Sequence, residues 1–193
     1  NYKAINFVCN KIFKITSAFS FCVCSIFLFF SSELGLVIYN NLESGYYFKI
    51  LAPLIFFMYM DNVIDSILKG LNKQFGVMCC NILDLTVTTC FIYFFLPVIG
   101  INGYVISIFI SELLNFTVSL FQLIKYAKLR IDLIDWIVIP IICCFVAFFV
   151  LSFIVLSFTN IIINLILNIF LFIVLYFITF CCLNYLKLKY QKK

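Results

Sequence analysis

Residues 47–97 read YFKILAPLIFFMYMDNVIDSILKGLNKQFGVMCCNILDLTVTTCFIYFFLP, and this stretch decides the fold. Two apolar runs, residues 47–68 and 78–96, flank a short polar turn at residues 70–76. About twenty mostly apolar residues, rising 1.5 Å each, make a helix about 30 Å long, which is the thickness of the hydrocarbon layer of a membrane. The stretch therefore predicts two transmembrane helices joined by a turn.

All lysine and arginine residues except Lys49 fall in four groups that long apolar runs separate. The groups are Lys3, Lys11 and Lys14; Lys69 and Lys73; Lys125, Lys128 and Arg130; and Lys187, Lys189, Lys192 and Lys193. About fifty residues lie between successive groups, which is room for two membrane crossings. Cytoplasmic loops collect basic residues. The chain is therefore predicted to span the membrane six times, with both of its ends in the cytoplasm.

The six predicted spans share an apolar composition and a length of about twenty residues. They cover residues 12–30, 47–68, 78–96, 103–124, 136–156 and 161–183. Residues 31–45 hold two acids and no basic residue, so they are predicted to form an outer loop. Residues 125–135 are predicted as an inner loop and residues 157–160 as an outer turn.

The three prolines of the chain lie within or at the end of predicted spans. Pro97, followed by Gly100, predicts the end of the third span and a tight outer hairpin to the fourth. Pro53 in the second span is expected to kink its helix, which a membrane tolerates when a neighbour satisfies the freed carbonyl. The fifth span carries Pro140.

The composition agrees with a membrane protein and excludes several functions. Hydrophobic residues make up 66% of the 193 residues and charged residues 11%, whereas soluble domains have about a quarter charged residues. The net charge of +5 comes from separated basic groups, so no nucleic-acid partner is expected. The chain has no histidine, and neither a metal nor a cofactor is expected. The ten cysteines are interpreted as small hydrophobic residues, because their spacings fit no zinc site.

An ordered set of short sequences resembles a known family. The set comprises Glu33-Leu34-Gly35, Glu43-x-Gly45-Tyr46-Tyr47, Ile50-Leu51-Ala52-Pro53-Leu54, Leu68-Lys69-Gly70-Leu71-Asn72-Lys73-Gln74, Leu96-Pro97 and Gly100-Ile101-Asn102-Gly103. In this order and spacing the set is similar to the C-terminal half of the stage V sporulation protein B family. These are polysaccharide-biosynthesis membrane proteins of the superfamily that includes lipid II flippases and multidrug extrusion transporters. The resemblance covers residues 32 to about 125, and the last two spans agree only by position.

The resemblance implies a protein of about fourteen helices, in two six-helix lobes with two helices appended. Residues 1–126 would be the second part of the C-terminal lobe, and residues 127–193 the appended pair with a basic tail. Such proteins flip or export lipid-linked sugar precursors across the cell membrane during spore envelope or cell wall assembly.

The resemblance has two departures. The family's N-terminal lobe, where related flippases keep basic cavity residues, is absent from this chain, and Asn72 stands where many relatives are expected to have glycine. Because the chain begins with Asn1, we expect an upstream portion to be missing. Six spans lack the facing lobe of an alternating-access cavity, so the chain alone is expected to be inactive.

Four acidic side chains lie inside the predicted spans: Asp61, Asp65, Asp84 and Glu112. Asp61 and Asp84 are placed at a similar depth, about 4.5 Å to the cytoplasmic side of the centre of their spans. Glu112 is near the middle of its span, and Asp65 lies deeper toward the inner headgroups. An ionised carboxylate at such depth costs several kcal/mol unless it is paired, hydrated or protonated. We therefore expect these acids to line a water-filled cavity and to bind a proton or a sodium ion during alternating access.

The alternative is a structural role for the same acids. Asp65 precedes Lys69 by four residues, which is the favourable order for an ion pair on a helix. Asp61 would then stay neutral among Asn62 and other amides, or reach toward the headgroups.

Small and polar residues recur every four positions along the fourth span. They are Gly103, Ser107, Ser111, Asn115 and Ser119. Such residues allow two helix backbones to approach closely, and their hydroxyl groups can bond across the interface. We interpret this stripe as a packing seam in preference to a substrate-lining face.

Three other functions are compatible with six spans. An intramembrane enzyme is disfavoured, because the chain has no histidine and no GxSxG motif, and its loops are too short for a soluble active site. A cation-coupled antiporter of drugs or organic cations in the same superfamily is the main alternative. A six-helix membrane subunit without transport activity of its own is the third.

Overall fold

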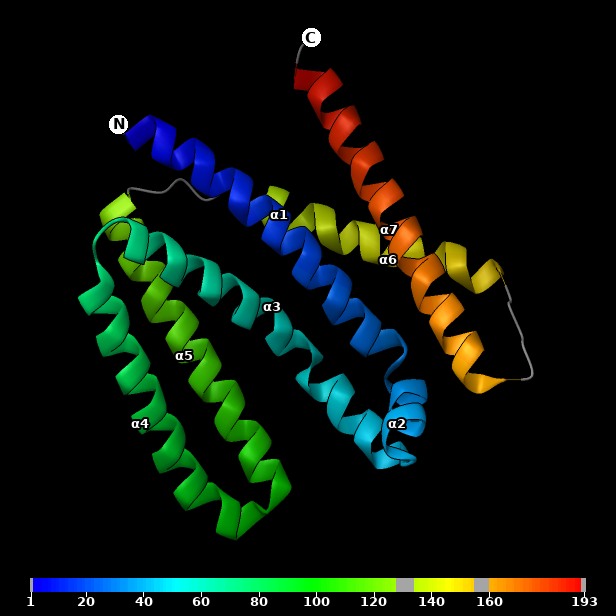
Figure 1. Cartoon of the computed structure of the whole chain (residues 1–193), viewed down its shortest axis with the longest axis horizontal. Helices are drawn as coiled ribbons and strands as arrows, with labels where there is room; N and C mark the ends of the chain where they lie inside the picture. The colour runs from blue at the N-terminus through cyan, green and yellow to red at the C-terminus, as the bar shows by residue number, and fades with distance from the viewer. Residues whose placement is uncertain (1, 128–133, 155–159, 192–193) are drawn as a thin grey trace. The chain divides into compact units, whose positions relative to one another are not determined.

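The computed structural model of the chain describes residues 2–127, 134–154 and 160–191, and these ranges are almost entirely helical (Figure 1). The elements are α1 (Tyr2–Phe29), α2 (Ser31–Tyr39), α3 (Leu42–Gly70), α4 (Gln74–Ile99), α5 (Ile101–Ala127), the π-helical segment η1 (Ile134–Val138), α6 (Ile139–Phe153) and α7 (Ile161–Gln191). Six helical stretches in the described ranges are long and apolar enough to cross a membrane, and they coincide with the six predicted spans. The predicted all-α membrane fold is confirmed.

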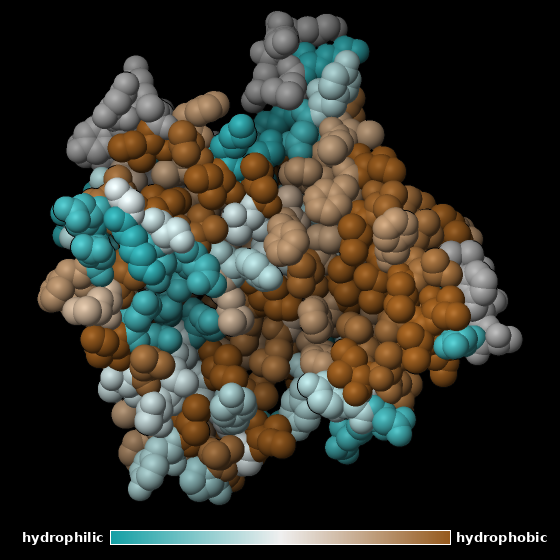
Figure 2. Space-filling view, in the orientation of Figure 1, coloured by the Kyte–Doolittle hydropathy of each residue, from teal (hydrophilic) through white to brown (hydrophobic). Residues whose placement is uncertain are grey.

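Large apolar side chains remain exposed along these helices. Val98 is 81% exposed, Tyr93 75% and Phe75 72%. Figure 2 shows apolar side chains (brown) over most of the face that it presents, with hydrophilic residues (teal) confined to patches. Lipid is a suitable solvent for such a surface, because α-helices satisfy their backbone hydrogen bonds internally. The chain is therefore a multi-pass membrane protein.

The chain folds into two compact units. The first comprises Asn1–Thr16 and Leu54–Ile131, and the second comprises Ser17–Pro53 and Asp132–Lys193. α1 and α3 each contribute to both units. The predicted division after residue 126 concerns the lobes of a larger transporter and stays a prediction.

In the first unit, α4 and α5 form a hairpin whose turn depends on glycine. Gly100 has a φ of 66°, in the left-handed region that glycine adopts without strain. A Cβ atom on Gly103 would lie 2.4 Å from the Phe95 carbonyl oxygen, so the start of α5 approaches the α4 backbone closely. The predicted hairpin is confirmed. The prediction that the helix stops at Pro97 was wrong, because α4 continues to Ile99. Pro97 has no N–H to donate to the carbonyl four residues earlier, but it lies in the last turn, which the Gly100 N–H closes on the Leu96 carbonyl.

The second unit packs the later part of α1 against α6 and α7. Its core is made of Cys22, Phe30, Ile139, Cys143, Cys144, Ala147, Leu151, Leu165, Phe172 and Tyr176. The Phe29 and Phe148 rings stack with their centroids 3.8 Å apart. The Tyr176 hydroxyl, which is fully buried, donates a 2.8 Å hydrogen bond to the Ala18 carbonyl. All ten cysteines of the chain are free thiols.

The predicted outer loop at residues 31–45 was wrong in part, because residues 31–39 form α2. Asn40 ends this helix in the left-handed conformation, with a φ of 51°. α2 then folds back on the start of α3: a Cβ on Gly35 would lie 2.5 Å from the Gly45 nitrogen, and one on Gly45 would lie 2.7 Å from the Ser31 carbonyl oxygen. Two glycines ten residues apart therefore permit a tight helical turn where only a loop was predicted.

Several helices extend beyond the predicted spans. α1 begins at Tyr2, before the predicted start at residue 12, and α7 continues to Gln191. Helices can continue past the hydrocarbon layer into the headgroups, so the crossing segments are unaffected. α3 continues through Pro53. Most of the predicted inner loop at 125–135 and most of the outer turn at 157–160 lie outside the described residues.

Candidate functional site

The four acids predicted from the sequence lie in the first unit. Asp61 and Asp65 come from α3, Asp84 from α4 and Glu112 from α5. Asp61 and Asp65 are each only 8% exposed, and Asp84 and Glu112 are half-buried. Glu112 lies close enough to Asp61 and Asp84 to interact electrostatically with both carboxyl groups. The structure thus brings together the three acids predicted at a similar depth.

The polar stripe of α5 faces these acids. The Asn115 amide donates a 2.9 Å hydrogen bond to Asp61 Oδ2. The Ser111 hydroxyl donates to Asp84 Oδ1. Ser119 lies beside the Asp61 carboxyl group. The acids and the stripe were predicted as separate features, and they form one polar cluster.

The first two residues of the same stripe contact backbone groups and no acid in the described part of the chain. Gly103 meets the α4 backbone, as described above, and Ser107 is fully buried with its hydroxyl donating a 2.7 Å hydrogen bond to the Gly103 carbonyl of its own helix. Gly103 and Ser107 fit the predicted packing seam. Ser111, Asn115 and Ser119 do more, because they contact carboxyl groups.

α4 adds polar partners that the sequence analysis did not select. The Asn81 amide donates to Asp65 Oδ2 at 3.4 Å, and the Thr88 hydroxyl shares a hydrogen bond with Ser111. Asn81 and Thr88 lie three residues before and four residues after Asp84, so the three side chains share one face of the helix. This spacing is the signal by which they are detectable in the sequence.

Several buried polar atoms of the cluster have no hydrogen-bond partner in the described part of the chain. They are the acceptors Asp61 Oδ1, Asp65 Oδ1 and Asn115 Oδ1, and the Ser119 hydroxyl, which can both donate and accept. Buried polar atoms are nearly always paired, because an unpaired one costs about 1–3 kcal/mol. Several unpaired oxygens within one cluster can be satisfied by a proton, by water or by a cation.

Lys69 does not neutralise the cluster directly. It interacts with Asp61 and Asp65 electrostatically, but no ion pair joins it to Asp65 among the described residues. The Asn62 amide donates to the Met58 carbonyl of its own helix rather than to an acid. Among the described residues, the Asp65–Lys69 ion pair and an Asp61–Asn62 contact are not formed, but the Asn115 amide does bond to Asp61, so the structural alternative for Asp61 stays open.

The oxygen ligands of the cluster suit a monovalent cation better than a divalent metal ion. No three His, Cys, Asp or Glu side chains in the described ranges are arranged to hold a metal ion. Carboxylate, amide and hydroxyl oxygens are nevertheless the ligands that hard cations prefer. A proton or a small monovalent cation would satisfy the oxygens of Asp61, Asn115 and Ser119.

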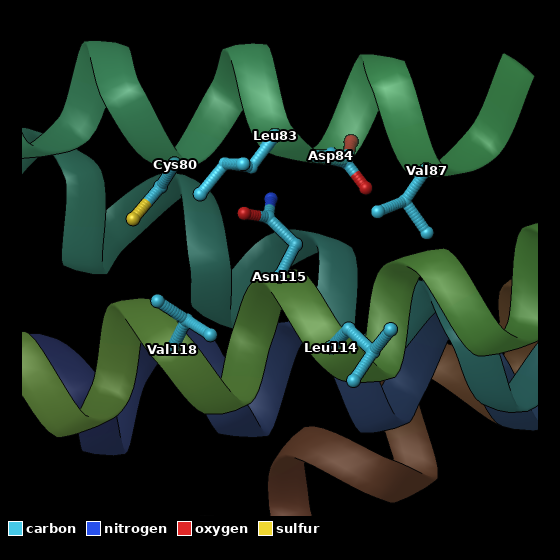
Figure 3. A pocket seen from close by; sticks show the side chains of 7 residues that line it. All are labelled: Cys80, Leu83, Asp84, Val87, Leu114, Asn115 and Val118. Carbon is cyan, nitrogen blue, oxygen red and sulfur yellow. The ribbon is translucent and has the colours of Figure 1, made fainter. Parts of the chain in front are cut away.

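A pocket of about 210 Å³ lies beside the cluster, between α4 and α5 (Figure 3). Its lining residues are Cys80, Leu83, Asp84 and Val87 from α4, and Leu114, Asn115 and Val118 from α5. In Figure 3 the Asp84 and Asn115 side chains extend into the space between the two helices. The Gln122 amide donates to the Cys80 sulfur at 2.9 Å near one end of the pocket. The pocket is therefore lined mainly by apolar side chains, with one carboxyl group and one amide.

No family model matches the chain, and neither the search of curated proteins nor the search of solved structures found a match.

Proposed function

We propose that the chain is the C-terminal part of a cation-coupled transporter that flips or exports a lipid-linked oligosaccharide or peptidoglycan precursor. The cargo and its use in spore envelope or cell wall assembly follow from the resemblance to the stage V sporulation protein B family. The coupling follows from the polar cluster of α3, α4 and α5. The proposal places the protein in the cell membrane, with both ends of this chain in the cytoplasm.

One observation carries the coupling: Asp61 and Asp65 are buried within a membrane-spanning helix, and each keeps one carboxyl oxygen without a donor. Ionisable side chains at such depth are expensive and commonly mark the path of an ion or a proton. The Asn115 and Ser119 oxygens beside Asp61 supply further ligands. The acids repel a diphosphate, so they are assigned to the coupling ion and not to the cargo.

The cluster suggests how ion binding is coupled to movement. Without a cation, the carboxyl groups of Asp61, Asp84 and Glu112 repel one another, and hydration of the cluster favours separation of their helices. A bound proton or sodium ion removes that repulsion and lets the Asn115–Asp61 and Ser111–Asp84 contacts draw the helices together. The ion thereby favours one conformation of the unit, which is what coupling requires.

The proposal is tested with the complete protein reconstituted in liposomes. Translocation of a lipid-linked sugar is measured under a sodium gradient and, separately, under a proton gradient. We expect Asp61→Asn, Asp84→Asn or Glu112→Gln to reduce the gradient-driven rate at least tenfold. Glu33→Gln is the matched control, because Glu33 is an exposed acid on α2. Wild-type rates in all three cluster variants would end the coupling proposal, whereas a sodium or proton response without sugar transport would reject the cargo alone.

The pocket in Figure 3 favours a second function, antiport of an organic cation. Its walls are apolar, and Asp84 offers a carboxyl group to a positively charged ligand. The same liposomes distinguish the two functions: uptake of a lipophilic ammonium ion that depends on Asp84, without flipping of a lipid-linked sugar, would support the antiporter.

A further inference from the structure

Lys73, in the turn between α3 and α4, places a positive charge at the N-terminus of α4, where positive charge is unfavourable. Lys73 is the residue directly before α4, no side chain caps this helix, and its first turn has no acidic residue. The N-terminus of a helix carries a partial positive charge, so acidic or hydroxyl side chains usually occupy this position. The start of α4 therefore has an excess of positive charge.

A second ammonium group reaches the same place from α5. The Lys73 Nζ lies 4.8 Å from the centroid of the Tyr126 ring, and the Lys125 Nζ lies 6.0 Å from the same centroid. The ring face attracts both cations. Neither lysine forms an ion pair with an acid among the described residues. Two like charges thus lie at one aromatic ring.

The surroundings of this cationic pair are those of a membrane surface. Lys73, Lys125 and Tyr126 are exposed, and they lie at the ends of membrane-spanning helices that are predicted to face the cytoplasm. Beside them, Phe75 in the first turn of α4 is 72% exposed, and Phe121, one turn before Lys125 on α5, is 69% exposed. The surface therefore offers cations to a headgroup and apolar side chains to acyl chains.

We infer that Lys73 and Lys125, positioned by the Tyr126 ring, bind the phosphate of an anionic phospholipid of the inner leaflet. The phosphate places negative charge between the two ammonium groups and opposite the uncapped start of α4. The acyl chains lie along Phe75 and Phe121. A soluble phosphate ion would meet the same lysines but would gain nothing from the apolar residues, so the lipid is the favoured ligand. Lys69 is not assigned to this lipid site, because it interacts electrostatically with Asp61 and Asp65.

Native mass spectrometry of the purified chain tests the inference. The protein in detergent is titrated with phosphatidylglycerol and, separately, with phosphatidylcholine of the same acyl chains. We expect tighter binding of phosphatidylglycerol and a loss of affinity of at least about fivefold in Lys73→Gln/Lys125→Gln, because each basic side chain contributes to anionic lipid binding. Lys73→Arg/Lys125→Arg and Tyr126→Phe are expected to keep the affinity, and Tyr126→Leu to lower it.

The control removes the same charge elsewhere on the same predicted side. Lys11→Gln/Lys189→Gln changes two exposed lysines that lie far from the turn in sequence, and we expect it to keep wild-type affinity. An equal loss in this control would overturn the inference in favour of a general surface charge. Displacement of phosphatidylglycerol by an equimolar amount of inorganic phosphate would overturn it in favour of a soluble anion. Retention of the wild-type preference in Lys73→Gln/Lys125→Gln would overturn it outright.

Discussion

The hydroxyl group of Ser17 on α1 donates a hydrogen bond to the backbone carbonyl of Trp136 in the π-helical segment η1. Trp136 lies four residues before Pro140, and a proline has no N–H to offer the carbonyl at that position. Both Ser17 and Trp136 are buried. A neighbouring helix thus satisfies the carbonyl that the proline frees, which is how membranes tolerate proline inside a span.

Ser17→Ala is expected to lower the free energy of unfolding by about 1 kcal/mol, because it removes the buried hydrogen bond to the Trp136 carbonyl. The measurement is reversible unfolding of the purified chain in mixed micelles. Ser66→Ala is the control, since the exposed Ser66 hydroxyl bonds only to the Asn62 carbonyl of its own helix. In a Pro140→Ala background the Ser17→Ala change is expected to matter less, because the introduced alanine supplies the N–H that proline lacks. Equal losses in both backgrounds would contradict the assignment.

Gly103→Ala is expected to destabilise the hairpin of α4 and α5 by about 1–3 kcal/mol through overpacking. The added methyl group would meet the Phe95 carbonyl, which is backbone and cannot move aside alone. Gly70→Ala is the matched control, since a Cβ there meets no atom within 4 Å. Thermal unfolding of both variants measures the difference, and a Gly103→Ala protein as stable as Gly70→Ala would refute the close approach.

Ser107→Leu tests whether this part of the stripe packs helices together. Ser107 is fully buried, so the larger side chain is expected to impair folding and lower the yield of monodisperse protein. Val118→Leu on the same helix is the control, because Val118 is exposed. A well-folded Ser107→Leu protein that lacks transport activity would instead indicate a functional face.

Asn115→Leu is expected to destabilise the first unit by about 1–3 kcal/mol, because it leaves Asp61 Oδ2 without its donor. Adding Asp61→Leu removes the buried acid as well and is expected to recover most of the stability. Chemical unfolding of the two single variants and the double variant measures the interaction. Additive effects would show that the two side chains do not depend on each other.

The six-span topology predicts that Lys73 and Asn102 lie on opposite sides of the membrane, because α4 separates them. Both residues are exposed. Single cysteines at the two positions, in a variant without other cysteines, are treated with an impermeant maleimide in oriented membranes. We expect one position to react from outside and the other only after permeabilisation. Reaction of both from the same side would overturn the topology.

Part of the candidate site was predictable from the sequence. The positions of Asp61, Asp84 and Glu112 along their spans predicted a similar depth, because a helix has a fixed rise per residue. The contribution of Asn81 and Thr88 was not predicted, although their spacing from Asp84 puts them on its helix face. The contacts of Asn115 with Asp61 and of Ser111 with Asp84 were beyond the sequence analysis, because they depend on how α3, α4 and α5 rotate about their axes.

The short helix α2 is a part of the fold that likewise could not be predicted from the sequence. Residues 31–45 were predicted to form a loop, because they contain no apolar run long enough to cross the membrane and no basic residue. The close contact of Gly35 with Gly45 is a packing relation between two segments, and neither segment reveals it alone.

By itself the sequence determined the all-α membrane class of the protein and its six apolar spans, and it predicted a similar depth for three of its acidic side chains. These properties follow from local quantities, namely the length of an apolar run, the rise of a helix and the side on which lysine gathers. Tertiary structure alone decided which buried oxygens lack a hydrogen-bond donor and which carbonyl accepts a hydrogen bond from Ser17. It also decided that the Lys73 and Lys125 ammonium groups both lie near the Tyr126 ring. Those relations depend on the rotation and separation of helices, which packing sets after the spans have formed.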